Sequence, residues 1–309
     1  MTPGLLASRP VTETLTSNAF HLVHKAGPAA ACAIVSGEFR LTETTNLYRT
    51  APDIGPILPY PESIPQEHAD HYLAQGAIPI REGFKKLACP DCVKCVPARI
   101  VLDDFKPGRE HRRIVARNRD LAIQIYPGLP PLAGNEGKPA LGLEANIDLH
   151  IRHMIARGYW DAPSTQNPNE QVATLSQALA SFQDSAHYPG LRPHFIAAID
   201  ESERLVGGLL FFTGAAAAFG GMFYHTPERI KTSLGQAMVL ESIAWLQDAG
   251  YKYLYLGDWT RVATPYSWKG NYTPLELFIH DEWTRMKNRP DIRAQRCTYG
   301  QIRPGPRTP

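Results

Sequence analysis

Residues 236–249 form a long apolar segment, which constrains the fold more than any other part of the sequence. So few of its positions are polar that it predicts a buried helix ending at Gly250. Residues 251–256 then carry aromatic and aliphatic side chains on both faces, as in a central strand covered by helices. Turn, helix and strand are therefore predicted to form one unit. Its Ser233-Leu234-Gly235 turn places backbone N–H groups at a helix N-terminus, where they can meet an anion or a developing oxyanion.

The composition limits the classes of partner. The chain has 309 residues, 43% of them hydrophobic, and a net charge of +2, so any nucleic-acid surface has to be a local patch. The first thirty residues lack a basic start followed by an apolar core, which predicts no secretory signal and a cytoplasmic enzyme. Residues 205–224 carry no charge over a membrane-spanning length. Their glycines favour two strands instead, so we expect no membrane partner.

A cysteine run, Cys89-x2-Cys92-x2-Cys95, places three thiols close together. In a reducing compartment this spacing is typical of ligands for zinc or an iron–sulfur cluster. Three thiolates are one ligand short of a closed tetrahedral site, and the sequence does not select the fourth among Cys32, Cys297 and the histidines. The alternative is that these cysteines are small buried residues in a tight turn, and we expect no cofactor to be required for the reaction.

The most basic segment of the chain follows, in residues 105–120. Its Lys-Pro-Gly start predicts a helix from Gly108, on which Arg109, Arg113 and Arg117 fall at i, i+4 and i+8 and make one stripe. Arg112 adds a further guanidinium. Arginine forks suit phosphate oxygens, so one interpretation is an RNA backbone contact. The other is an ordinary solvated helix face.

Taken together, these motifs resemble the aminoacyl-tRNA–protein transferases of the N-degron pathway, that is, bacterial aspartate/glutamate leucyltransferases and the related arginyltransferases. The resemblance runs from about residue 72 to residue 283, and its motifs stand in the family's order. They are the cysteine run through Ile100, residues 105–113, residues 151–158, Ser233-Leu234-Gly235, residues 253–257 and Trp268-Lys269.

The resemblance implies an α+β fold with a GNAT-like acyltransferase core in the C-terminal half and an N-terminal region that carries the cysteine motif. We therefore expect a region 1–135 with the cysteines and the basic helix, and a transferase domain at 136–309. The residues themselves predict the order β-β-β-α-β, with further helices at 66–74, 143–156 and 171–182. The strands are expected at 194–199, 205–212, 216–224 and 251–256.

The implied reaction transfers an aminoacyl group, leucyl or arginyl, from charged tRNA to the N-terminal amine of a protein or peptide. The tRNA ester is already activated, so catalysis has to hold the substrates together, keep the amine neutral and stabilise the oxyanion. Asp258 is our candidate for the base or for binding the acceptor's ammonium group, and a capping role is the alternative. Backbone N–H groups around Ser233 and Gly235 are the candidates for the oxyanion.

Further site residues are expected from their places in these motifs. Lys269 is a candidate for the terminal phosphate of the tRNA, or else a surface lysine. Arg152 and His153 occupy the family's Arg-His position and are expected to line the acceptor or tRNA groove, or else to form a structural ion pair. Trp259 and Trp268 can stack on the terminal adenine or pack in the core. The remaining residues expected on the pocket wall are Tyr224 and Tyr255.

The sequence also departs from the family's pattern. Where the family's strand ends in Phe-Asp-Pro, this chain has Tyr224-His225-Thr226-Pro227, and Asp258 stands where an aromatic is usual. These changes favour an altered acceptor or transferred amino acid, which leaves a small amine or a precursor peptide as an alternative acceptor. An acyl-CoA-dependent GNAT enzyme is a further alternative, although Thr232 stands where its pyrophosphate turn requires arginine or glutamine. A non-catalytic RNA-binding protein is the last.

Overall fold

The computed structural model describes residues 48–49, 64–80, 83–87, 95–130, 142–164, 167–185, 188–260, 267–279 and 281–286. The helices of this part are α2 (Gln66–Ala74), α3 (Arg109–Arg117), α4 (Leu143–Ala156), α5 (Pro168–Ser185) and α6 (Leu234–Asp248). Its short 3-10 helices are η4 (Leu102–Asp104), η6 (Pro227–Thr232) and η7 (Ser267–Asn271).

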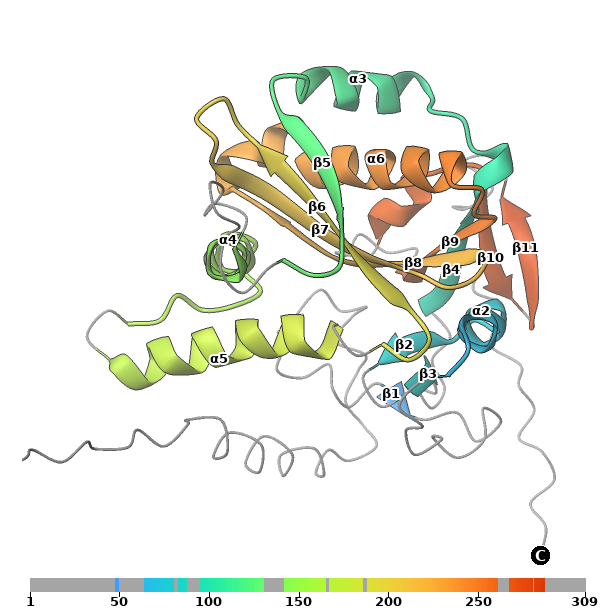
Figure 1. Cartoon of the computed structure of the whole chain (residues 1–309), viewed down its shortest axis with the longest axis horizontal. Coiled ribbons are helices and arrows are strands. Elements are labelled where there is room, and N and C mark those ends of the chain that lie inside the picture. The colour runs from blue at the N-terminus through green and yellow to red at the C-terminus, as the bar shows by residue number, and fades with distance from the viewer. Residues whose placement is uncertain are drawn as a thin grey trace, which may run out of the picture.

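An eight-stranded sheet with the order β11-β10-β4-β9-β8-β7-β6-β5 forms the centre of the fold (Figure 1). Its neighbours are antiparallel except for β8 and β9, which run parallel. The strands are β4 (Cys95–Val101), β5 (Ala122–Pro127), β6 (Arg192–Ile199), β7 (Leu205–Thr213), β8 (Ala217–His225), β9 (Tyr253–Thr260), β10 (Leu275–Ile279) and β11 (Glu282–Met286). A smaller sheet has the order β1-β3-β2 and consists of β1 (Tyr48–Arg49), β2 (Ile78–Ile80) and β3 (Gly83–Leu87).

Helices cover both faces of the large sheet, with α3 and α6 on one face and α4 and α5 on the other (Figure 1). Strand β7 is buried at every position because successive side chains enter opposite cores. Leu209 and Phe211 belong to the core beneath α6, whereas Leu210 and Phe212 belong to the core beneath α4 and α5. This double burial explains why the sequence of β7 has no polar alternation.

The predicted order β-β-β-α-β is confirmed by β6, β7, β8, α6 and β9, and the α+β class is confirmed as well. The uncharged stretch 205–224 is the β7–β8 hairpin, and within the described residues no helix has the length and apolar character to span a bilayer. Strands β5, β10 and β11 were not predicted. Strands β4 and β5, which precede residue 136, lie in the same sheet as β6 to β11. The division at 135/136 stays a prediction.

The parallel pair β8 and β9 separates part-way along its length. Pairing is confined to three residue pairs, from Ala217↔Tyr253 to Phe219↔Tyr255, although the strands continue to His225 and Thr260. Helix α6 connects the far end of β8 to the start of β9, as a crossover between parallel strands requires. The sheet is therefore open between the C-terminal halves of these two strands.

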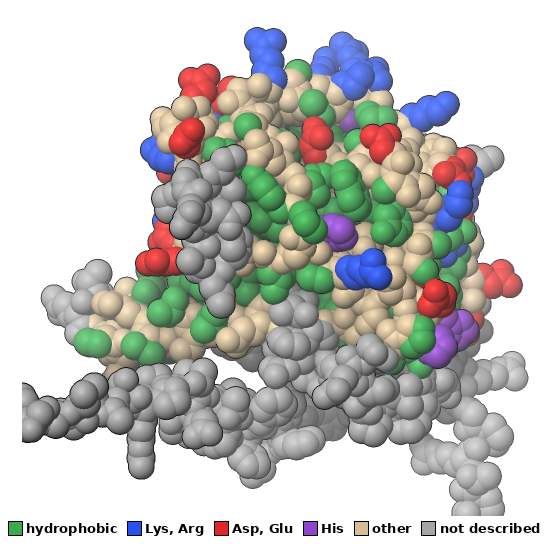
Figure 2. Space-filling view, viewed as in Figure 1, with side chains coloured by type: hydrophobic (Ala, Val, Ile, Leu, Met, Phe, Trp, Pro, Cys, Tyr) green, Lys and Arg blue, Asp and Glu red, His purple; other side chains and the backbone are tan. Residues whose placement is uncertain are grey.

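Basic side chains gather over α3, on one side of this opening. Figure 2 shows Lys and Arg side chains along the top of the molecule, over α3, and a largely hydrophobic central surface below them. The buried side chains of α3 are His111 and Ile114, and its arginines are exposed to solvent. The predicted solvent-facing arginine stripe is thus present on α3.

Candidate functional site

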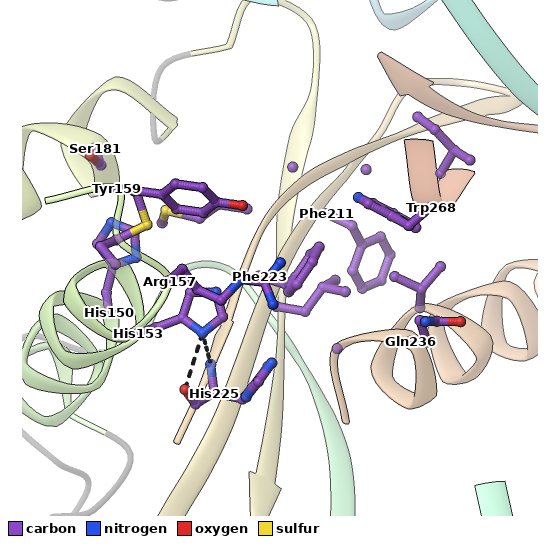
Figure 3. A pocket seen from close by; sticks show the side chains of 18 of the residues that line it. His150, His153, Arg157, Tyr159, Ser181, Phe211, Phe223, His225, Gln236 and Trp268 are labelled. Atoms are coloured by element: carbon purple, nitrogen blue, oxygen red, sulfur yellow. Dashed lines mark hydrogen bonds between the residues drawn. The ribbon is translucent and has the colours of Figure 1, made fainter. Parts of the chain in front are cut away.

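A cavity of about 520 Å³ occupies the opening between β8 and β9 (Figure 3). Its walls come from these two strands, the N-terminal half of α6, η7, and the facing sides of α4 and α5. The lining is mainly apolar, with polar groups concentrated at the start of α6, on η7 and on α4. Such a mixture of apolar walls and a few placed polar groups is typical of a substrate site.

The start of α6 forms one wall of the cavity, and Ser233 and Gly235 both line it. Ser233 has a left-handed backbone (φ 60°, ψ 41°), which ends η6 and turns the chain into α6. The N–H of Ser233 donates to the carbonyl of Ile230 at 3.2 Å, and that of Gln236 donates to the carbonyl of Ser233 at 2.9 Å, so of the predicted donors Gly235 is the one outside these two bonds. A Cβ on Gly235 would lie 2.7 Å from the Phe223 ring, so glycine permits the helix to approach β8 this closely. The predicted turn therefore lies at the site, whereas its oxyanion role stays a prediction.

Lys269, on η7, lines the cavity from another side. Its ammonium group donates a hydrogen bond to the backbone carbonyl of Asp258, and the side chain is buried, not on the surface. Burial lowers the pKa of Lys269 to about 8, and the charge of Asp258 opposes this shift. The protein thus holds a cation with a reduced proton affinity at the wall of the cavity.

Asp258 itself is buried behind Lys269 and is not one of the residues that line the cavity. It lies on β9 opposite Pro97 of β4, two residues along from Cys95, whose charge also acts on Lys269. In this position Asp258 bears on the cavity through Lys269, and its direct role in catalysis stays a prediction.

The cysteine motif can be placed only in part. Cys89 and Cys92 lie outside the described residues, whereas Cys95 begins β4 opposite Thr260. Among the described side chains, no group of three or more His, Cys, Asp or Glu is arranged to hold a metal ion. A metal at the cysteine motif therefore stays a prediction.

Histidines from α4 and β8 form a third polar group of the site. His153 of α4 lies with its ring centroid 4.6 Å from that of His225, and its Nδ1 is within hydrogen-bond distance of the backbone N and O of His225 (Figure 3). Burial, with the charge of His225, lowers the pKa of His153 to about 3. Burial also lowers the pKa of His150 to about 4 and reduces that of His225. All three imidazoles are therefore neutral at pH 7.

Helix α4 presents different charges on its two sides. Arg152 points away from the cavity and is paired with Asp148 at 2.9 Å on the exposed surface, which is the structural ion pair considered from the sequence. Arg157 lines the cavity, as do His150, His153 and Met154 at the helical spacing i, i+3, i+4 and i+7. The cavity-facing arginine of this helix is thus Arg157.

The four aromatic residues expected at the pocket are divided between the cavity and the two cores. Trp268 lines the cavity and meets the Phe223 ring edge-on at 5.5 Å. Trp259 belongs to the core beneath α6, and Tyr224 and Tyr255 belong to the opposite core. The Tyr224 hydroxyl donates to Asn146 Oδ1 at 2.7 Å, and the Tyr255 hydroxyl accepts from Arg99 at 3.0 Å. These three side chains connect structural elements and do not line the cavity.

Hydrogen bonds join α3 to two walls of the cavity, η7 and the start of α6. His111 Nε2 lies 3.0 Å from the carbonyl of Asn271 in η7, and the Asn118 amide donates to the carbonyl of Thr232 at 2.9 Å. On its outer side, Glu110 pairs with Arg113 at 3.5 Å and with Arg117 at 3.2 Å. Two arginines share this one exposed carboxylate, and Arg109 and Arg112 are exposed as well, so the surface of α3 is strongly basic.

Sequence reasoning missed several residues of the cavity, above all His225, Arg157 and Phe223. The pattern of α4 carried a usable signal, because its polar residues recur at the spacing of one helix face. No comparable signal marks Phe223, because its place depends on the separation of β8 from β9 and on the close approach of α6.

Comparison with known proteins shows a similarity to one family of transferases. The family described as "Arginine-tRNA-protein transferase, C terminus" matches residues 161–279, which include β8, α6, β9 and η7. An aspartate/glutamate leucyltransferase of Pseudomonas fluorescens is 29% identical over 195 residues, covering 63% of this chain and 73% of the relative. Another, of Xanthobacter autotrophicus, is 25% identical over 263 residues, covering 79% of this chain and 97% of the relative.

The chain is similar to the aminoacyl-tRNA–protein transferases. The matched segment includes most walls of the cavity, whereas α4, which supplies His150 and His153, precedes residue 161. Among solved structures, L-PGS from Bacillus licheniformis is 12% identical, with 62% of this chain and 58% of that chain covered and a TM-score of 0.38, too low for an argument about fold.

Proposed function

We propose that this transferase moves an aminoacyl group from charged tRNA to the N-terminal amine of a protein or peptide. The observation that carries the proposal is the meeting of the α6 N-terminus and the buried Lys269 at one cavity. Both groups favour negative charge, and both are enclosed, where such interactions are strongest. A GNAT-like core is part of the proposal and is supported by the β-β-β-α-β order with a parallel pair joined by α6.

The chemistry needs little beyond this arrangement. The aminoacyl ester is already activated, so an amine can attack it without ATP or a metal-bound intermediate. As the carbonyl becomes tetrahedral, its oxygen gains charge that the first N–H groups of α6 and the Lys269 ammonium can stabilise. Each such donor is worth roughly 10²- to 10³-fold in rate.

The lining favours a leucyl over an arginyl donor. None of the described residues that line the cavity is Asp or Glu, whereas two basic residues, Arg157 and Lys269, line it. An arginyl guanidinium would enter without a carboxylate partner and beside like charges, which is costly. An apolar side chain would meet Val239, Leu254 and Leu256. We therefore propose leucyl transfer, in agreement with the names of the relatives.

The tRNA body is assigned to α3. Its exposed arginines present guanidinium groups on a helix that is hydrogen-bonded to Asn271, at the end of η7, and to Thr232, in the turn before α6. Phosphate contacts by such a surface position the RNA without reading its sequence. Under this proposal α3 binds the acceptor arm of the tRNA, and the 3′ end of the tRNA enters the cavity.

The acceptor is assigned to the α4 side. Arg157 lines the cavity and forms no salt bridge within the described residues, so it can receive a carboxylate. We propose that an acceptor beginning with Asp or Glu, the two residues in the relatives' names, places its side chain there. A place in the N-degron pathway and in the cytoplasm belongs to the same proposal.

The test incubates the purified protein with tRNA charged with labelled leucine or, separately, arginine. Peptides that begin with Asp, Glu or Ala are offered as acceptors. We expect leucine to appear on the Asp and Glu peptides and the arginyl donor to remain unused. If the protein does not use charged tRNA but transfers from an acyl-CoA, the proposal is contradicted. If it transfers only to small amines, the acceptor is a small amine and not a peptide.

A further inference from the structure

His225 is held in one tautomer by a backbone carbonyl. Its Nδ1 lies 2.8 Å from the oxygen of Thr226, and a carbonyl oxygen can only accept a hydrogen bond. The proton of the neutral ring is therefore on Nδ1. Nε2 then carries a lone pair, and the residue lines the cavity. An imidazole in this state is ready to accept a proton.

The carbonyl that fixes this tautomer is itself well held. Thr226 caps the start of η6, where its oxygen also accepts from the N–H of Arg229 at 3.1 Å and its own N–H donates to Val206 at 2.9 Å. Pro227 begins η6, as is common in the first turn of a helix. The orientation of the His225 ring thus depends on backbone groups of β7, β8 and η6.

The groups packed around His225 keep it neutral. From α4, His153 contacts the ring and Arg157 lowers its pKa by charge, while burial is the main cause of the lowered pKa. From β7, the paired residue is Gly207, which has no charge. On η6, the Arg229 side chain is paired with Asp120 at 2.6 Å, and Glu228 is exposed. No carboxylate is among the causes that shift the pKa of His225; the hydrogen bond to the Thr226 carbonyl raises this pKa, and the larger effect of burial lowers it.

We propose that His225 is the general base of the reaction and takes the proton of the attacking amine on Nε2. The inference rests on the function proposed above and names a residue for one of its steps. The amine nitrogen forms the new C–N bond and gives one proton to Nε2, and the C–O bond to the ribose breaks. The imidazolium then returns that proton to the departing ribose oxygen, so the ring ends neutral with Nδ1–H still on Thr226.

The other titratable groups of the site are less suited to this step. Both ring nitrogens of His150 are buried without a partner, and the ring is enclosed by Trp160, Phe182 and Tyr224. The Nδ1 of His153 lies near both the N–H and the carbonyl of the His225 backbone, so its tautomer is not fixed, and its pKa is lowered to about 3. Lys269 is mostly protonated at pH 7, and Asp258 does not line the cavity.

The main test replaces His225 with Asn, whose amide nitrogen can take the place of Nδ1 on the Thr226 carbonyl but which has no equivalent of Nε2. We expect kcat for transfer to a Glu peptide to fall about 10²-fold or more, with KM for peptide and tRNA changed by less than a factor of about 3. His68→Asn, an exposed histidine on α2, is the matched control and should match the wild type. Added imidazole should restore part of the rate of His225→Gly.

The wild-type pH profile tests the same inference without a substitution. An acceptor amine has a pKa near 8, so log kcat/KM for the peptide rises with slope one below that value. With an essential base of lowered pKa, the slope steepens to two at the acid end, and His225→Asn keeps slope one. A single slope in the wild type, or full activity of His225→Asn, overturns the inference. Absence of transfer by the wild type with every donor and acceptor overturns the proposed function instead.

Discussion

The amide group of Asn118 joins α3 to the turn at the start of α6. Its nitrogen donates to the carbonyl of Thr232 at 2.9 Å and to the carbonyl of Ile114 at 2.9 Å, and the side chain is buried. Thr232 directly precedes Ser233, so the helix proposed to bind RNA and the proposed oxyanion site are connected through one side chain. Movement of α3 on binding tRNA would be transmitted to the turn before α6.

Replacing Asn118 by Leu, of similar size, removes both hydrogen bonds and leaves the carbonyls of Ile114 and Thr232 without this donor. We expect the free energy of unfolding to fall by about 1–3 kcal/mol, measured by urea denaturation. We also expect kcat to fall while the peptide KM is kept, because the α6 turn loses its tie to α3. Unchanged stability would show that water replaces the amide at both carbonyls.

Substitution of Arg113 or Arg117 by Gln should weaken donor binding without affecting the fold. Both side chains are exposed, so the melting temperature should stay within about 2 °C of wild type. We expect KM for charged tRNA to rise and the slope of log affinity against log salt to become shallower by about one for each arginine. The control is Arg204→Gln, another exposed arginine, paired with Asp200 in the β6–β7 turn. Equal losses in this control would mean that α3 has no special role.

Gly235→Ala tests the approach of α6 to β8. The new methyl would lie 2.7 Å from the Phe223 ring, closer than side-chain Cβ atoms approach, so either the ring or the helix start has to move. We expect a loss of kcat of about 10-fold or more. Gly108→Ala is the matched control, because a Cβ there meets nothing within 4 Å and the backbone φ is negative. A fully active Gly235→Ala enzyme would argue against a role for this wall.

Lys269→Met should affect activity and stability in opposite directions. The pKa of Lys269 is lower in the folded protein, about 8, than its ordinary value of 10.5, so the unfolded chain binds more protons between these values. The stability of the wild type therefore rises with pH across this window. Below pH 8, burial of the charged lysine makes the free energy of unfolding about 3 kcal/mol lower than it is above pH 10.5.

The Met variant lacks this cost and this pH dependence, which urea midpoints at pH 7 and pH 9.5 would reveal. At the same time it removes a cation from the proposed oxyanion site, so kcat should fall about 10²-fold. A variant that is no more stable at pH 7 than the wild type would indicate that the interaction with Asp258 compensates for burial of the ammonium group.

Local patterns predicted the helices well. The bounds of α4 agree with the prediction of 143–156, and α2 agrees with 66–74. Ser233, Gly235 and Lys269 were predicted at the site, and the structure places all three on one cavity. Each of these predictions depends on a motif or a helix end, and such features can be recognised in a short segment of sequence.

The remaining features depend on contacts between distant segments. The sequence of β8 is apolar on both faces, so it does not reveal that Phe223 faces the cavity and that Tyr224 faces the opposite core. His225 lines the site because β8 and β9 separate after Phe219, and no local pattern encodes that separation. The hairpin of β10 and β11 was missed because both strands are short and lack strict alternation.

The left-handed backbone at Ser233 limits which residues this position can accept. β-Branched side chains strongly disfavour that conformation, whereas Gly, Asn, Asp and, at some cost, Ser can adopt it. Threonine or valine there would change the angle between η6 and α6 and displace the N-terminus of α6 from β8. Engineered variants of this protein therefore have only a short list of substitutes at residue 233.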